Sequence, residues 1–258
     1  MGPLMPKKKS DRTKKLRPKK TIRNKKQPSA SSSGPLHPMK VPPSKTFPDG
    51  HITTRHEHCR HNPSGRDQFY PDEIHEIAKE HFSKVKKRPC PLPLKFGSSG
   101  SAYDELIAGW VQYWNELLTP DVPLEPNLFK ALVASESSFD PNILADRKNP
   151  KSARGLTQIT DDTRKILGDE KGELKDHHIT ATREEMNDPN ISIYAGVRWL
   201  FHKRHLASSK LGRMATWEEA VAEYKSIRQG LKRGVKRDKV LMDRFLKYLE
   251  DYRKCGTK

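Results

Sequence analysis

The stretch LFKALVASESSFDPNILADRKNPKSARGLTQI, residues 128–159, predicts a helix that ends in an acidic side chain. One face of this helix shows the expected three- and four-residue spacing and carries Leu128, Ala131, Leu132 and Ser135. Glu136 follows at the end of this helix, before the stop expected at Asp140 and Pro141. Because an apolar wall hydrates a charged carboxylate poorly, the pKa of Glu136 is expected to rise toward the value that a general acid needs. The alternative is an ordinary surface glutamate in a last turn.

Three further motifs follow in order along the chain. They are ARGLTQI at residues 153–159, DPNISIYAGVRWL at 188–200 and AVAEYK at 220–225. Together with the pair Glu136–Ser137, they resemble the glycoside hydrolase family that contains goose-type lysozyme and the soluble lytic transglycosylases. The resemblance covers residues 127–228. It implies a mainly α, lysozyme-like domain that cleaves the glycan strands of bacterial peptidoglycan and needs no cofactor or metal.

The resemblance also implies roles for individual residues. Glu136 would protonate the glycosidic oxygen of the MurNAc-GlcNAc β-1,4 bond and then accept the proton of the sugar's own 6-hydroxyl, which leaves a 1,6-anhydro end. Ser137 would orient Glu136, and Tyr224 would hydrogen-bond near Glu136 or the reacting ring. The residues expected around the substrate are Ser137, Gly155, Thr157, Gln158, Ile159 and Tyr224. Gly155 fits equally well a simple role as a turn residue.

Three positions depart from the family pattern. Thr157 stands where the family usually has Met, and Ser192 stands where Asn is usual. Lys225 replaces the Asn that follows the site tyrosine, and it adds a positive charge beside the expected cleft.

The acidic residues near the second motif bear on the product. Goose-type lysozymes hydrolyse their substrate with additional aspartates, but at those offsets this chain has Asn149 and Thr160, which are not bases at neutral pH. Asp146 and Asp161 lie nearby without matching the offsets. We therefore predict a lytic transglycosylase, with a hydrolytic muramidase as the alternative. A further alternative is a non-enzymatic polyanion-binding protein on an inactive lysozyme-like scaffold.

The charge of the chain is concentrated at its start. The net charge is +18, and residues 1–26 contain twelve Lys or Arg against the single acid Asp11, which leaves +7 for the rest. Residues 27–48 are rich in Pro and Ser, so we expect residues 1–48 to form a disordered basic tail. Its natural partners are polyanions such as acidic cell-wall polymers, nucleic acid or anionic lipid headgroups. The alternative is a solvated tail that only aids solubility.

Residues 49–100 are expected to form a His/Arg-rich segment with one helix that packs on the main domain. Ile74, Ile77, Ala78 and Phe82 recur at helical spacing after Pro71. Four histidines and Cys59 crowd into residues 51–61, but they match no closed zinc motif, so a basic surface segment is favoured over a metal site. The three cysteines are odd in number and far apart, which argues against a disulfide framework and still permits one pair.

The main domain is expected at residues 101–258, as a monomer. Ser101 is predicted to cap a helix in which Trp110 and Trp114 face the core, and further helices are expected at 127–137, 160–167, 189–206, 216–228 and 237–252. No membrane-spanning run or secretory signal is recognisable, so the chain reads as soluble and unprocessed. Action at the bacterial cell wall, in the periplasm or outside the cell, would then call for delivery by a phage or a secretion apparatus, or for an export signal of an unrecognised kind.

Overall fold

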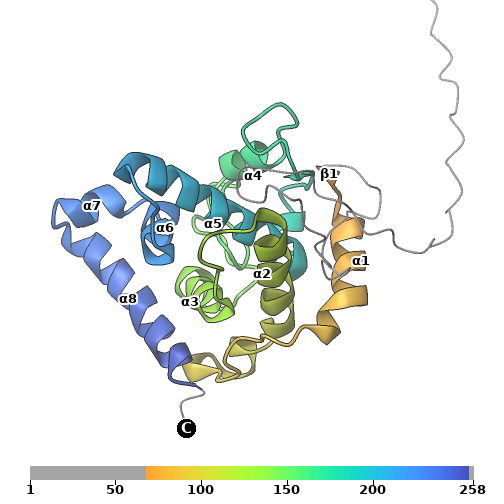
Figure 1. The fold of residues 1–258 in the computed structure, drawn as a ribbon, viewed down its shortest axis with the longest axis horizontal. Coiled ribbons are helices and arrows are strands. Elements are labelled where there is room, and N and C mark those ends of the chain that lie inside the picture. Colours follow the sequence, from red (N-terminus) through yellow and green to blue (C-terminus); the bar gives the residue numbers. More distant parts are fainter. Residues whose placement is uncertain (1–67, 256–258) are drawn as a thin grey trace, which may run out of the picture. The chain divides into compact units, whose positions relative to one another are not determined.

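The computed structural model describes residues 68–255, and this part of the chain is mainly helical, as predicted (Figure 1). The helices are α1 (Pro71–His81), α2 (Asp104–Leu118), α3 (Pro126–Ser137), α4 (Asp161–Leu167), α5 (Pro189–Leu211), α6 (Trp217–Tyr224), α7 (Arg228–Lys232) and α8 (Lys236–Arg253). Two short strands, β1 (Gln68–Phe69) and β2 (His178–Ile179), pair in parallel. The basic tail expected at 1–48 and the histidine cluster at 51–61 lie outside the described residues.

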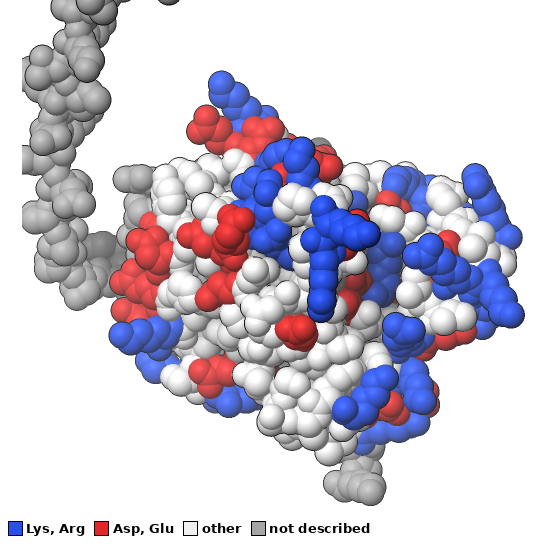
Figure 2. Space-filling model, turned by 180° about the vertical axis from the view of Figure 1, so that it is seen from behind, with Lys and Arg blue, Asp and Glu red and all other residues white. Residues whose placement is uncertain are grey.

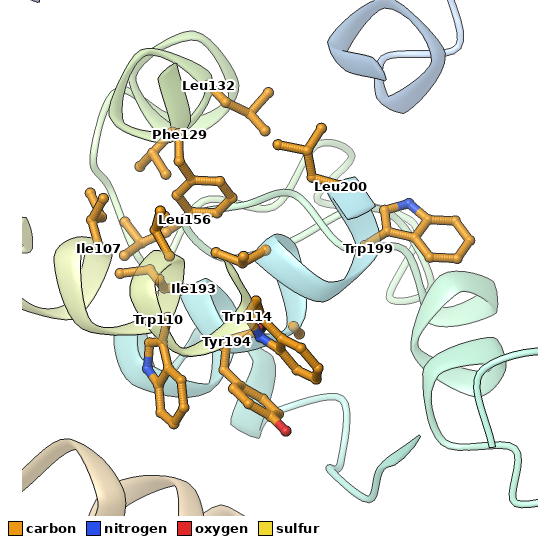
Figure 3. Close-up of a cluster of buried hydrophobic side chains, with 14 of the residues drawn as sticks. Ile107, Trp110, Trp114, Phe129, Leu132, Leu156, Ile193, Tyr194, Trp199 and Leu200 are labelled. Carbon is orange, nitrogen blue, oxygen red and sulfur yellow. Dashed lines mark hydrogen bonds between the residues drawn. The ribbon is translucent and has the colours of Figure 1, made fainter. Parts of the chain in front are cut away.

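The core is built from α2, α3 and α5, which lie side by side in the middle of the domain (Figures 1 and 3). Trp110 and Trp114 of α2 are fully buried beside Tyr194 of α5, which confirms that both tryptophans belong to the core. Each indole finds a hydrogen-bond acceptor on α5, Asn190 Oδ1 for Trp110 and the Tyr194 carbonyl for Trp114. Buried aromatic rings with satisfied N–H groups hold these two helices at a fixed spacing.

Helices α5 and α6 begin at residues that local sequence signals mark, whereas α2 does not begin where predicted. Asp188 caps α5 through the backbone N–H groups of Asn190 and Ile191, and Thr216 caps α6 with Glu219 in a capping box. The prediction that Ser101 caps α2 is wrong, because residues 94–100 form a 3₁₀ segment and α2 begins at Asp104, after Tyr103.

The helix ends differ from the predicted ranges where the backbone turns left-handed. The expected helix 216–228 is interrupted after α6, where Ser226 has a φ of 58°, and the chain restarts as α7 at Arg228. Helix α5 extends past residue 206 to Leu211 and stops at Gly212, whose φ is 68°. A glycine after a helix adopts this conformation without steric cost.

Helix α8 packs along α3, and a buried polar cluster joins the two. Lys130 of α3 is fully buried, pairs with Asp104 at 2.7 Å and lies 4.9 Å from the ring centre of Tyr252. Asn127 accepts the backbone N–H of Cys90 and donates to the carbonyl of Tyr252. Because a buried ammonium is tolerated only when it is paired, this cluster fixes how α3 and α8 meet.

A disulfide closes the same corner of the domain. Cys90 and Cys255 are bonded, their Cα atoms are 5.6 Å apart, and they are separated by 165 positions in the sequence. This is the single pair that the cysteine count permitted. It links the segment before α2 to the residues that follow α8.

Charged side chains of both signs share the surface. Lys and Arg occupy much of the face seen in Figure 2, with Asp and Glu gathered on one side and between them. Several of these groups form exposed pairs, for example Lys239 with Asp243, and such pairs add little to stability. Within residues 68–255, no helix has the length and apolar character needed to span a membrane.

We predict that the disulfide adds about 2–4 kcal/mol to the free energy of unfolding, because it restricts the unfolded chain over a long loop. The comparison is made in a Cys59→Ser background, which removes the third thiol. The double variant Cys90→Ser/Cys255→Ser should unfold at lower urea concentration than the oxidised parent. Equal midpoints would show that the bridge does not stabilise the domain.

Candidate active site

Glu136 lies in the last turn of α3, at the point where this buried helix reaches partial exposure. Its side chain is 18% exposed, whereas the residues from Leu128 to Ala134 are buried. Ser138 and Phe139 follow with φ values of 54° and 64°, so the chain turns away directly after the helix. The carboxyl group therefore projects from a rigid, buried support.

Ser137 secures this helix end. Its hydroxyl donates to the Val133 carbonyl and accepts the backbone N–H of Phe139, both at 3.2 Å. The side chain is thus engaged with the backbone rather than with Glu136, and it acts on the carboxyl group only by fixing where the helix stops.

Lys225 is the ion-pair partner of Glu136. The ammonium nitrogen lies 2.5 Å from Glu136 Oε1, and the Lys225 side chain is only 6% exposed. Lys225 directly follows α6, and its backbone N–H bonds to the Val221 carbonyl, so the end of that helix sets its position. The sequence indicated a positive charge near the cleft, and in the structure the Lys225 ammonium group contacts the Glu136 carboxyl group directly.

Tyr224 joins α6 to the loop of the second motif. Its hydroxyl donates to the Thr157 carbonyl at 2.6 Å. Burial, together with the negative charge of Glu136, raises the pKa of Tyr224 well above its usual value, so the hydroxyl keeps its proton. The tyrosine therefore presents a neutral, fixed O–H group near the carboxylate.

The loop at residues 153–159 is a tight turn closed by its own hydrogen bonds. Arg154 and Ile159 bridge each other in antiparallel fashion, and Gln158, with a φ of 50°, uses its side-chain amide to bond the carbonyls of Gly155 and Ile143. Ile159 is buried. The turn is thus held by hydrogen bonds within the chain.

Gly155 is required by the packing of this turn. It has a φ of 71°, and a Cβ atom on it would lie 2.1 Å from the Met186 carbonyl oxygen. The absence of a side chain at Gly155 lets the backbone of Met186 approach this turn closely. This contact fits a role of Gly155 as a turn residue, the alternative to contact with the substrate.

Two of the departures from the family pattern contact each other. Thr157 and Ser192 are both fully buried, and the Thr157 hydroxyl donates to the Ser192 carbonyl at 2.8 Å. The backbone N–H of Thr157 donates to Ser192 Oγ at 3.2 Å. Gly196, one turn further along α5, leaves room for the Thr157 side chain. Sequence reasoning noted both substitutions separately but did not pair them.

The two acids near this loop differ in their surroundings. Asp161 is buried, and hydrogen bonds from Arg183 and Arg164, with Lys165 also in contact, hold its pKa far below the usual value. Asp146 is exposed, and its Oδ1 accepts the backbone N–H of Lys148. Asp161 is therefore ionised at neutral pH and engaged by the neighbouring basic side chains. In the described part of the chain, no cluster of side chains could hold a metal ion.

The helical core with these four motifs in order defines a lysozyme-like domain. Residues 120–244 match the family model of the transglycosylase SLT domain, so the chain carries a domain of the lysozyme-like lytic transglycosylase family. This family membership supports activity of the lytic transglycosylase type on cell-wall peptidoglycan. No curated protein matches the chain.

The contact between Thr157 and Ser192 predicts a stability defect in Ser192→Ala. This change leaves the buried N–H of Thr157 without its acceptor, which should lower the free energy of unfolding by about 1–3 kcal/mol. Urea unfolding measures the loss, and Ser209→Ala, an exposed serine of the same helix, is the control expected within about 0.5 kcal/mol of the parent. If the two variants were equally stable, the pairing would have no energetic weight.

Proposed function

We propose that this protein is a lytic transglycosylase that cleaves the MurNAc-GlcNAc β-1,4 bond of peptidoglycan, with Glu136 as its acid/base. The observation that carries the proposal is the position of Glu136, which ends a buried helix inside the SLT domain with Tyr224 and Lys225 beside it. A surface glutamate would have neither the buried support nor these two neighbours. The alternative of an ordinary last-turn residue is therefore disfavoured.

Glycan cleavage by this site needs a single carboxyl group. In its protonated form, Glu136 gives its proton to the glycosidic oxygen as the bond to the MurNAc anomeric carbon breaks. The substrate's own N-acetyl group stabilises the cationic centre. The Glu136 carboxylate then takes the proton of the MurNAc 6-hydroxyl, whose oxygen bonds to the anomeric carbon and closes the 1,6-anhydro ring.

The residues around Glu136 hold the substrate in position relative to its carboxyl group. Tyr224 supplies a neutral hydroxyl that is anchored on the loop at 153–159, and the Gln158 amide stiffens the same loop. We propose that this loop and Tyr224 contact the N-acetylated sugar. A turn that is held by hydrogen bonds within the chain loses little conformational entropy when it binds a sugar, which favours binding.

The surroundings of Asp161 favour the anhydro product over hydrolysis. A hydrolytic muramidase needs a carboxylate that positions a water and takes its proton. Asp161 is bound by two arginines and a lysine and is a weak base, because their charges stabilise its ionised form. Asp146 lies in an exposed loop and is engaged with the backbone of that loop.

We predict that Glu136→Gln folds normally and loses lytic activity by about a thousandfold or more, because the amide cannot donate the proton. Clearing of purified peptidoglycan measures the activity. Glu125→Gln is the matched control, since Glu125 precedes the other end of α3 and its side chain is 52% exposed. Activity of Glu136→Gln near that of the parent would refute the assignment. A parent protein that binds peptidoglycan or nucleic acid without cleaving the glycan would favour the polyanion-binding scaffold.

The product itself gives a separate prediction. Mass spectrometry of digested peptidoglycan should show 1,6-anhydro-muramoyl ends, about 18 mass units lighter than hydrolysed ends, because no water is added. Asp146→Asn should leave this product unchanged. Products with reducing ends only, together with a folded but inactive Asp146→Asn or Asp161→Asn, would instead identify a hydrolytic muramidase.

A further inference from the structure

A groove lies beside α2, on residues that take no part in the site around Glu136. It encloses about 760 Å³ between α2, the segment that follows α1 and the loop that leads into α3, within the range of about 300–1,000 Å³ found for ligand sites. Its floor is apolar and includes Ala108 and Val111 of α2 and Leu124 of the loop. Most of its lining precedes residue 120, where the match to the SLT family model begins. The groove therefore lies largely outside the matched domain.

Hydrogen bonds fix two sides of this groove. Asn115 of α2 accepts the backbone N–H of Leu124 at 2.7 Å and donates to the Leu124 carbonyl at 2.9 Å, which ties the loop to the helix. At the end of the segment that follows α1, the backbone N–H of Cys90 donates to Asn127 of α3, and Cys90 is also held by the disulfide. A groove with anchored walls loses little conformational entropy when a ligand binds.

Three lysines, Lys84, Lys86 and Lys87, lie along one edge of the groove. All three are exposed, and none of them forms an ion pair within residues 68–255. The next basic residue along the chain, Arg88, differs because it pairs with Glu105 at 2.9 Å. Unpaired ammonium groups so close in sequence repel one another, so an anion bound between them lowers the electrostatic energy.

The acidic residue at the groove does not cancel this charge. Glu125 lies in the loop, and Arg253 donates to both of its carboxylate oxygens, at 3.0 and 3.1 Å. The charge of Glu125 is thereby compensated without the lysines. The backbone N–H groups of Lys86 and Lys87 have no acceptor among the described residues, so this edge offers further donors beside the ammonium groups. The groove therefore suits a ligand that combines several carboxylates with small apolar groups.

We propose that this groove binds the peptide stems of peptidoglycan, as a second contact with the cell wall that is separate from cleavage; for the substrate class, this rests on the proposed function. The stems carry free carboxylates that complement the lysines and alanine methyl groups that complement the apolar floor. The uncharged glycan would leave the lysines unused. A phosphate polymer would leave the apolar floor uncovered.

The position of the groove lets it act together with the cleavage site. Pro126 lines the groove and begins α3, whereas Glu136 lies in the last turn of the same helix, about 15 Å further along at about 1.5 Å per residue. A stem in the groove thus leaves the Glu136 carboxyl group free for a glycan. Two contacts with one polymer raise the overall affinity, because the second contact forms at a high effective concentration.

Binding is tested in the inactive Glu136→Gln background, so that cleavage does not remove the ligand. Uncross-linked glycan strands that carry their stems, and strands from which an amidase has removed the stems, are immobilised separately. The variant Lys84→Gln/Lys86→Gln/Lys87→Gln should bind stem-bearing strands about tenfold or more weakly than the background protein, because one of two contacts is lost. On stripped strands, the variant and the background protein should bind equally.

A matched control separates the groove from overall charge. Lys232→Gln/Lys236→Gln/Lys247→Gln removes the same charge from exposed residues of α7 and α8 and should bind stem-bearing strands like the background protein. Equal losses in the two triple variants, or an equal loss on stripped strands, would overturn the proposal. Circular dichroism verifies folding, and Lys86→Gln/Lys87→Gln is a smaller change should the groove variant fail to fold.

An NMR titration of the parent gives a readout that needs neither activity nor a variant. The probe is the N-acetylated stem tripeptide L-alanyl-γ-D-glutamyl-meso-diaminopimelate. The backbone signals of Lys86 and Lys87 and the side-chain amide signal of Gln112, which also lines the groove, should shift and saturate. Cleavage of peptidoglycan by a protein that lacks these shifts would overturn the inference and leave the proposed function standing. Saturable shifts in a protein that does not cleave peptidoglycan would leave the groove standing and refute the proposed function.

Discussion

The burial of α3 is the constraint on which the site depends. This helix is surrounded by α2 and α8 and is covered along most of its length, so each polar group that it carries needs a partner inside the protein. Lys130 is satisfied by Asp104, and Ser137 by the backbone around it. After its first two residues the helix is buried as far as Ala134, and it approaches the solvent again at its last turn, where Glu136 lies. A support that cannot move places the carboxyl group in one position, which a proton-transfer reaction requires.

The motifs that identify the family largely contact one another. Tyr224 from the fourth motif bonds Thr157 of the second, and Thr157 bonds Ser192 of the third. Lys225 from the fourth meets Glu136 of the first. Segments far apart in the sequence are thus connected by hydrogen bonds and an ion pair. Thr157 and Tyr224, which the resemblance placed around the substrate, form hydrogen bonds within this network. Their spacing in the sequence therefore reflects the assembly of the site.

Periodicity predicted the helices well, because the faces that it identifies are the faces that become buried. Trp110 and Trp114 were assigned to the core from their spacing alone, and they are fully buried. Helix ends were harder to predict, since a left-handed residue such as Ser226 has no sequence signature comparable to glycine. The start of α2 was misplaced because a serine that could cap a helix lies within reach of the real start.

Interactions between distant segments were beyond sequence reasoning. The positive charge of Lys225 was recognisable from the sequence. That it pairs with Glu136 depends on where α6 ends relative to the last turn of α3. Likewise, spacing could not reveal that Thr157 and Ser192 bond to each other, since that contact joins two separate segments of the chain. The sequence also did not indicate that two arginines bind Asp161, because one of them, Arg183, comes from another segment of the chain.

The bridge between Cys90 and Cys255 encloses every helix of the site in one covalent ring. Cys255 follows all of them in the sequence, so during synthesis the ring can close only after α2 to α8 have left the ribosome. Until the bridge closes, the domain is held together by the packing of its helices alone, and closure then joins the segment before α2 covalently to the residues that follow α8.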